Sequence, residues 1–191
     1  MGNNIKGEYK LKDALEIPNI LCYIRIVLIP VFVMIYAKAD DINDYFIASL
    51  IILISALTDF ADGYIARKYN KVTELGKLID PLADKLSQAG ILIALMIKIE
   101  KMYLFVILFA VKELFMAVNT YILFRKGKKL DGAQWYGKVS TAVFYVVMFI
   151  IILLPSLSLT WVSTLVSISA CFMVLSLVMY GIEFNKMYKL K

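Results

Sequence analysis

Four aspartates lie in a part of the sequence that is otherwise strongly apolar. Asp59 and Asp62 come near the end of one apolar run, and Asp80 and Asp84 come near the start of the next. A carboxylate near the centre of a bilayer costs ~2.5–3.5 kcal/mol or more, so several of them at the ends of membrane helices need a compensating partner. The sequence therefore predicts a bound cation, and a divalent metal ion is the obvious candidate.

The spacing of the aspartates supports this interpretation. Asp59 and Asp62 are three residues apart and Asp80 and Asp84 are four apart, so each pair shares one face of a helix. Residues 68–74 form a short polar connection between the two pairs. Carboxylate oxygens suit Mg²⁺ or Mn²⁺, and two such ions ~3.5–4 Å apart are typical of phosphoryl-transfer sites. The alternative is two polar helix ends in water that bind nothing.

Composition places the chain in the membrane. Of its 191 residues 61% are hydrophobic, and the net charge of +6 is better explained by anionic lipid headgroups than by nucleic acid, for which no motif is present. There is no histidine, which excludes histidine-based nucleophilic or zinc chemistry. Cys22 and Cys171 fall within predicted helices and are interpreted as packing or lipid-facing residues, with no disulfide implied.

Apolar runs long enough to span about 30 Å of hydrocarbon recur six times along the chain. The predicted helices cover residues 18–37, 45–67, 79–98, 102–124, 138–155 and 161–182. We therefore expect an all-α polytopic membrane protein with six transmembrane helices. Residues 1–16 are predicted to be a cytosolic or interfacial segment, 17–185 the transmembrane domain, and 186–191 a basic cytosolic tail.

Loop charges predict the orientation. Lysines and arginines are concentrated before the first helix, after the second, after the fourth and at the end of the chain, whereas the opposite loops are diluted by acids. The positive-inside rule therefore places both termini in the cytoplasm. In this orientation the aspartates face the cytosol, and an integral membrane protein of the bacterial plasma membrane is expected.

The residues around the aspartates resemble the signature of the CDP-alcohol phosphotransferase family. The matching residues are Asp59, Asp62, Gly63, Ala66, Arg67, Gly76, Asp80 and Asp84. The resemblance implies that an alcohol displaces CMP from a CDP-linked donor, with the first three aspartates as metal ligands. It implies that Asp84 is the general base, and as the fourth carboxylate of the cluster Asp84 is also a candidate metal ligand.

The same resemblance implies a donor site. Its predicted residues are Asp62, Gly63, Ala66, Arg67 and Gly76. Arg67 can bind a phosphate in bidentate fashion, and the two glycines let a nucleotide approach the backbone. Residues 17–32 resemble family members that use CDP-diacylglycerol, at Pro18, Asn19, Arg25 and Pro30. Arg25 inside an apolar helix must face a phosphate or a carboxylate, unless it extends to the interface.

The acceptor is left open between two glycerol-type alcohols. Arg25, Lys112, Glu113 and Lys138 are predicted to line a cytosol-open acceptor cavity. Lys112 and Glu113 point ~100° apart on a helix and are expected to serve different partners. The framework resembles phosphatidylglycerophosphate synthases, which use glycerol 3-phosphate, and this acceptor is favoured.

Two departures make a second acceptor credible. Thr120 and Ser140 stand where that branch usually carries cations. Phosphatidylglycerol, the acceptor of cardiolipin synthases, carries a single charge and needs fewer cationic partners. The other hypotheses are an ion-coupled transporter and a lipid-binding scaffold. The resemblance also implies a homodimer.

Overall fold

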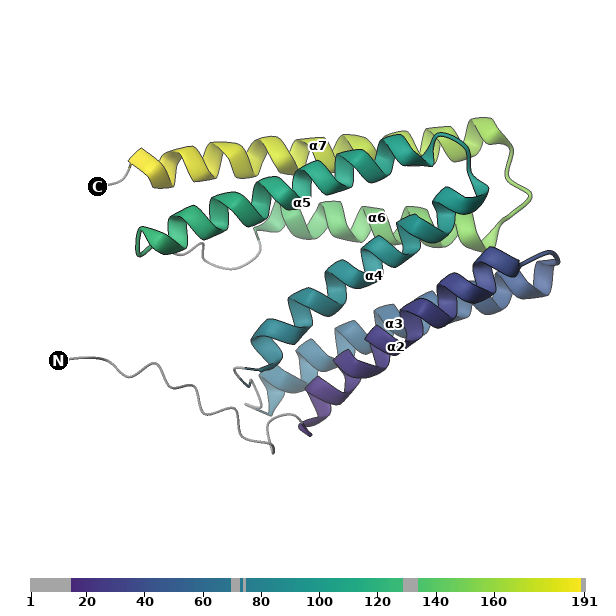
Figure 1. The fold of residues 1–191 in the computed structure, drawn as a ribbon, viewed down its shortest axis with the longest axis horizontal. Coiled ribbons are helices and arrows are strands. Elements are labelled where there is room, and N and C mark those ends of the chain that lie inside the picture. The colour runs from purple at the N-terminus through teal and green to yellow at the C-terminus, as the bar shows by residue number, and fades with distance from the viewer. Residues whose placement is uncertain (1–14, 70–72, 74, 129–133, 190–191) are drawn as a thin grey trace. The chain divides into compact units, whose positions relative to one another are not determined.

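The computed structural model describes residues 15–69, 73, 75–128 and 134–189, without the side chains of Ala66, Arg67 and Lys77. Six α-helices and no strand are present in these residues (Figure 1). The helices are α2 (Ile17–Lys38), α3 (Ile42–Lys68), α4 (Gly76–Lys98), α5 (Met102–Arg125), α6 (Trp135–Leu153) and α7 (Leu159–Lys189). The predicted all-helical class is confirmed, and residues 1–14 of the predicted N-terminal segment lie outside the described part.

Five of the six helices are long and apolar enough to cross a membrane, judged by length and composition over the described residues. Helix α4 is not among these five, because its first ten residues include two lysines and two aspartates. The protein is an integral membrane protein of the all-α class. A sixth crossing by α4, together with the orientation of the termini, stays a prediction.

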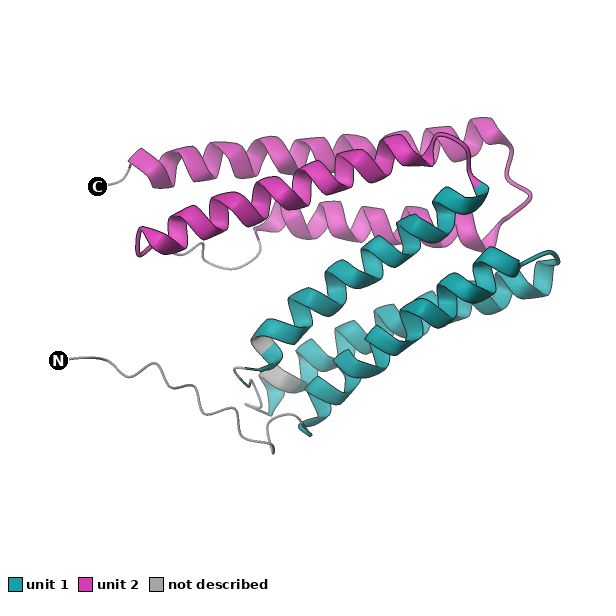
Figure 2. Cartoon of the chain, in the orientation of Figure 1, with its two compact units in different colours: residues 1–98 teal, residues 99–191 magenta. Residues whose placement is uncertain are grey.

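The chain divides into two compact units (Figure 2). Unit 1 comprises Met1–Lys98 and carries α2, α3 and α4, whereas unit 2 comprises Ile99–Lys191 and carries α5, α6 and α7. All four aspartates therefore belong to unit 1. Three of the predicted acceptor residues, Lys112, Glu113 and Lys138, belong to unit 2.

In unit 1, α2 packs against both α3 and α4. At Gly90 of α4 a Cβ would clash with the side chain of Ile29, so the glycine permits a close approach of α4 to α2. At the end of α4, Lys98 Nζ donates to Tyr45 Oη (2.9 Å) and to the backbone oxygen of Ala39. These contacts join the end of α4 to the α2–α3 turn. The four aspartates lie at the opposite end of the three helices.

In unit 2, α7 packs against both α5 and α6. Leu123, Tyr136, Tyr180 and Phe184 form its buried hydrophobic cluster. Helix α7 continues to Lys189, seven residues beyond the predicted end of its apolar run at residue 182. Its charged last turns are held by contacts that hydropathy cannot reveal: Tyr188 Oη donates to Asn119 (3.0 Å) and Lys128 Nζ donates to the Met187 oxygen (2.7 Å).

Candidate metal and active site

Two helices of unit 1, α3 and α4, bring acidic side chains to one buried arginine on the third helix, α2. The guanidinium of Arg25 on α2 forms ion pairs with Asp59 and Asp62 on α3, and its Nη1 atom lies 3.7 Å from Asp80 Oδ1 on α4. Arg25 is 1% exposed. The arginine that the sequence predicted to need a phosphate or carboxylate partner therefore lies among carboxylates, and it offsets part of their mutual repulsion.

The cluster is closed on one side and open on the other. Asp62 is buried, whereas the side chains of Asp59 and Asp80 are 47% and 52% exposed. Ions and polar ligands can therefore reach the carboxylates from the side of Asp59 and Asp80 without unfolding a helix.

Asp84 lies one turn beyond Asp80 and has different neighbours. Gln88 Nε2 donates to both of its oxygens, at 2.9 and 3.0 Å, and Lys85 Nζ lies 3.7 Å from Asp84 Oδ2. Gln88 is buried. An amide that bonds both carboxylate oxygens restricts the rotation of the carboxylate, so Asp84 is held in one orientation. Gln88 belongs to no motif recognised in the sequence, although its position four residues after Asp84 places both on one face of α4.

The first turn of α4 is joined to α2 by a polar contact. Asn19 Nδ2 donates to Thr73 Oγ1 (3.0 Å), and the same hydroxyl accepts from the Gly76 backbone N–H (2.9 Å). A Cβ on Gly76 would lie 2.6 Å from Asn19 Oδ1. Gly76, predicted as a donor-binding residue, is therefore also a point of close contact between helices, because no other residue fits there without displacing Asn19.

The sequence left two interpretations open for Cys22, a packing residue or a lipid-facing one, and packing is correct. Cys22 is 2% exposed, and its Sγ donates to Asp62 Oδ2 at 3.4 Å, so it packs inside the cluster and does not face lipid. One ligand atom each from Cys22, Asp62 and Asp80 lie within 4.8 Å of one another. A usable signal was present in the sequence. Asn19, Cys22 and Arg25 recur every three residues and so share the face of α2 that meets the site.

The remaining predicted donor residues lie on α3 beside the cluster. Gly63 follows Asp62 directly and is half-buried. The side chains of Ala66 and Arg67 lie outside the described residues, so their predicted contacts with the donor stay predictions.

The predicted acceptor residues of unit 2 differ in environment. Lys112 is buried, and its Nζ lies 3.0 Å from Glu113 Oε1. The expectation of different partners for these two was wrong, because their flexible side chains close the angle between adjacent helical positions. Lys138 is exposed in the first turn of α6, Thr120 is exposed, and Ser140 is 2% exposed.

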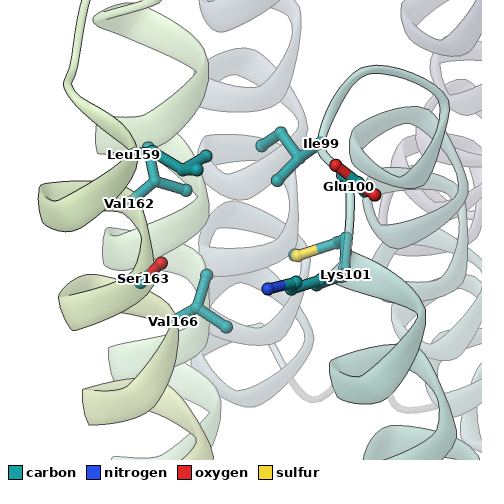
Figure 3. Close-up of a pocket in the computed structure, with 8 residues that line it drawn as sticks. Ile99, Glu100, Lys101, Leu159, Val162, Ser163 and Val166 are labelled. Carbon is teal, nitrogen blue, oxygen red and sulfur yellow. The ribbon is translucent and has the colours of Figure 1, made fainter.

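Unit 2 also contains a cavity of about 150 Å³ between the start of α5 and the start of α7 (Figure 3). It is lined by Ile99, Glu100, Lys101, Met102, Leu159, Val162, Ser163 and Val166. In Figure 3 the nitrogen of Lys101 points toward α7. None of the predicted site residues lines this cavity.

The donor set of the unit 1 cluster fits a hard divalent cation. Asp59, Asp62 and Asp80 offer carboxylate oxygens, the ligand type that Mg²⁺ and Mn²⁺ prefer. Among the described side chains, these three carboxylates meet the guanidinium of Arg25, and a divalent ion would offset their negative charge further.

Comparison with known proteins bears on what such a site does. A profile of the CDP-alcohol phosphatidyltransferase family matches residues 15–181. A Rickettsia typhi protein named CDP-diacylglycerol–glycerol-3-phosphate 3-phosphatidyltransferase is 41% identical over 83 residues, which is 44% of this chain and 46% of the relative. A Haemophilus influenzae protein of the same name is 30% identical over 132 residues, 66% of this chain and 69% of the relative.

A second name occurs among the relatives. A Mycobacterium tuberculosis protein named "Putative cardiolipin synthase" is 30% identical over 167 residues, 87% of this chain and 78% of that protein. The alignments with the Rickettsia proteins span about half the length of each relative. The match to the mycobacterial protein extends along most of both chains.

Proposed function

Because the chain belongs to the CDP-alcohol phosphatidyltransferase family, we propose that it transfers a phosphatidyl group from CDP-diacylglycerol to a glycerol-type alcohol and releases CMP. The acceptor oxygen forms a bond to the donor phosphorus, the bond from that phosphorus to CMP breaks, and the hydroxyl proton leaves to a base. The observation that carries this proposal is the convergence of Asp59, Asp62 and Asp80 from two helices at the open end of unit 1.

Asp59, Asp62 and Asp80 are the proposed ligands of Mg²⁺ or Mn²⁺, in a site for two ions that Asp84 can complete. When bound, such ions neutralise the charge of the donor diphosphate and orient it. Arg25 compensates the charge of Asp59 and Asp62 and so keeps the carboxylates close together. To bind the acceptor phosphate as predicted, its guanidinium would have to release these two aspartates.

Asp84 is the proposed general base. It lies one turn from Asp80 on the same face of α4, and Gln88 holds both of its oxygens. A carboxylate fixed in this way can receive the proton of a hydroxyl that is bound beside it, because its side chain does not first have to change rotamer.

The donor site is proposed to include Asp62, Gly63, Ala66, Arg67 and Gly76. Thr73, Gly76 and Asn19 support this site, because their contacts fix the first turn of α4 against α2. The apolar faces of α2 and α3 offer a surface for the acyl chains of a lipid donor.

Glycerol 3-phosphate is the proposed acceptor, and Arg25, Lys112, Glu113 and Lys138 are its proposed binding residues. The names of the Rickettsia and Haemophilus relatives support this choice. The pairing of Lys112 with Glu113 supports a role for Lys112 that depends on its neighbour, since the carboxylate holds the buried amine in place.

Phosphatidylglycerol is the alternative acceptor. Two observations favour it. Thr120 and Ser140 are uncharged, and the mycobacterial relative that aligns over most of the chain is named "Putative cardiolipin synthase". The transporter hypothesis is disfavoured by membership of an enzyme family.

The proposed setting is the bacterial plasma membrane, with both termini and the aspartates on the cytoplasmic side. With α4 as the sixth crossing, the lysine- and arginine-rich loops all lie on the cytoplasmic side, as the positive-inside rule requires. A homodimer and contacts of the basic face with anionic lipids complete the proposal.

One assay tests the reaction and identifies the acceptor. Purified protein in detergent receives CDP-diacylglycerol, Mg²⁺ or Mn²⁺, and either glycerol 3-phosphate or phosphatidylglycerol, and CMP release is measured. We expect CMP with glycerol 3-phosphate and not with phosphatidylglycerol. Release with phosphatidylglycerol alone would establish the alternative, and no release with either would reject the phosphatidyl transfer.

A further inference from the structure

The cavity at the first turns of α5 and α7 combines an apolar wall with two charged side chains. It has a volume of about 150 Å³ and lies wholly within unit 2. Its wall on α7 includes Leu159, Val162 and Val166, whereas the α4–α5 turn contributes Glu100 and Lys101 (Figure 3). The proposed phosphatidyl transfer uses none of these residues.

We propose that this cavity binds the headgroup of a zwitterionic glycerophospholipid. Lys101 binds the phosphate, Glu100 binds the ammonium, and the apolar wall on α7 contacts the glycerol and the first methylene groups of the acyl chains. The site goes beyond the proposed reaction. It is also distinct from the basic face for which contacts with anionic lipids are proposed.

The two charged side chains match a zwitterion. Both are exposed, and neither forms an ion pair among the described residues, although they are neighbours of opposite charge. In Figure 3 the nitrogen of Lys101 points toward α7, and the carboxylate of Glu100 lies at the turn. A headgroup that carries a phosphate and an ammonium on a short linker can pair with both, whereas an anionic headgroup would bring its charge close to Glu100 without compensation.

The backbone of the turn supports a role for the lysine side chain. Lys101 has a φ of 70°, the only positive φ of a non-glycine residue in the described part of the chain. Glycine adopts this left-handed conformation at lower cost. A lysine that is held in it indicates that the position requires the side chain, as strained residues at ligand sites do. The next residue, Met102, is buried and anchors the turn in unit 2.

The cavity lies at the depth of lipid headgroups. Helices α5 and α7 are both long and apolar enough to cross a membrane, and the cavity is at the first turns of both. Tyr103 and Trp161, in these turns, are exposed, and such residues gather at the membrane–water interface. A phospholipid beside this end of unit 2 therefore presents its headgroup to the cavity. In the predicted orientation it belongs to the leaflet that faces away from the cytosol.

The volume fits a headgroup. A cavity of this size holds a molecule as large as benzene, and a phosphoethanolamine group has about eight non-hydrogen atoms, only slightly more. The cavity is too small for acyl chains, which would lie outside it along the apolar surface of α7.

Hydroxyl donors on α7 extend the site. Ser163 lines the cavity, and Ser169 follows the lining residue Val166 by three positions, on the same face of the helix. Ser169 is 1% exposed, and its Oγ has no hydrogen-bond partner among the described residues. The ester carbonyls of a glycerophospholipid lie between its phosphate and its acyl chains. They are acceptors of the kind that this buried donor lacks.

Quenching of tryptophan by brominated lipids tests the site, because the chain has only two tryptophans. Trp161 is next to the lining residue Val162, whereas Trp135 begins α6 and lines no part of the cavity. Their exposed fractions are 62% and 64%, so the surrounding lipid reaches both to a similar degree. Trp135→Phe leaves Trp161 as the reporter of the cavity, and Trp161→Phe leaves Trp135 as the matched control.

The full-length variants in an uncharged detergent receive phosphatidylethanolamine or phosphatidylglycerol with brominated acyl chains. We expect half-quenching of Trp161 at a mole fraction of phosphatidylethanolamine about two- to fivefold lower than that of phosphatidylglycerol, the effect of one exposed ion pair. Trp135 should show no preference for phosphatidylethanolamine. This comparison needs no substitution in the cavity.

Substitutions at the turn assign the two contacts. In the Trp135→Phe background, Glu100→Gln should remove the preference for phosphatidylethanolamine. Lys101→Gln should weaken quenching by both lipids about two- to fivefold, and Lys101→Arg should restore it. Lys38→Gln is the control, because Lys38 ends α2 and lines no part of the cavity.

Several results would overturn the inference. These are equal quenching of Trp161 by the two lipids, stronger quenching by phosphatidylglycerol, the same preference at Trp135, or no effect of Lys101→Gln. Complete relief of the quenching by soluble O-phosphoethanolamine would assign the cavity to a free phosphate ester and reject a lipid. The readout uses neither CDP-diacylglycerol nor an acceptor, so its outcome is independent of the proposed function.

Discussion

Gln88 donates hydrogen bonds to both oxygens of Asp84, at 2.9 and 3.0 Å, from one turn further along α4. The amide is buried, and its bonds hold the partly exposed carboxylate in one orientation. This pair links the proposed base to a residue that no motif identified.

Asp84→Asn is expected to lower turnover by about 10²–10⁴-fold, because an amide cannot accept the hydroxyl proton. Binding of CDP-diacylglycerol should be retained, as measured by equilibrium binding of a labelled donor. If donor and metal binding disappear together with turnover, Asp84 is better described as a ligand than as a base.

Gln88→Met should lower kcat while leaving the donor KM near its original value, since it removes both bonds to Asp84 and conserves side-chain volume. Loss of a positioning contact predicts a smaller effect than loss of Asp84 itself. The control is Ser87→Ala on the same helix, because the buried Ser87 hydroxyl bonds only the Ala83 backbone oxygen in the described contacts. Equal kcat losses in the two variants would contradict a specific role for Gln88.

Asp80→Asn should reduce activity on the order of 10²–10³-fold or more at saturating Mg²⁺, because it removes one of the proposed metal ligands. The same is expected of Asp59→Asn and Asp62→Asn. Asp44→Asn, an acid at the other end of α3, is the control. Near-normal turnover of Asp80→Asn would be strong evidence against the proposed metal site.

Lys112→Ala should raise the KM for the acceptor by roughly 10- to 100-fold, which corresponds to the loss of one charge-assisted hydrogen bond. The KM for CDP-diacylglycerol should change less. Glu113→Gln tests whether the 3.0 Å pair positions Lys112, and it should show a weaker effect of the same kind. An effect confined to the donor would place Lys112 elsewhere.

Thr120→Arg discriminates between the two acceptors, because Thr120 is exposed and can carry a cation without burying it. If the acceptor is a phosphate monoester, the added charge should improve glycerol 3-phosphate use, measured as kcat/KM. Thr120→Gln is the uncharged control. Ser140→Lys is a poorer test, since Ser140 is buried and an ammonium there would be costly. Impaired phosphatidylglycerol use with unchanged glycerol 3-phosphate use would favour the cardiolipin interpretation.

Gly76→Ala should destabilise the protein by about 1–3 kcal/mol, the usual cost of forcing extra volume into a packed contact. The new Cβ would lie 2.6 Å from Asn19 Oδ1. Gly181→Ala is the control, because its Cβ would meet Phe115 at an ordinary 3.7 Å. Thermal unfolding in detergent measures both, and equal midpoints would show that Asn19 moves aside without cost.

The helices themselves could be predicted from the sequence, since apolar runs of this length have no other backbone solution in lipid. Their ends were less predictable. The last turns of α7, beyond residue 182, carry Glu183, Lys186 and Lys189, and hydropathy alone ends the helix before them. Contacts such as that of Tyr188 with Asn119 extend it, and these depend on packing between α7 and α5.

The sequence by itself determined which residues are candidates for the chemistry, because Asp59, Asp62, Asp80 and Asp84 are spaced to share helix faces and local geometry alone aligns each pair. Only the tertiary structure decided which partners meet them. Arg25 and Cys22 are 37 and 40 residues from Asp62 along the chain, and nothing in that separation indicates contact. Their approach depends on how α2 packs against α3 and α4, which is set by side-chain shape at contacts such as Gly90 with Ile29 and not by helical periodicity.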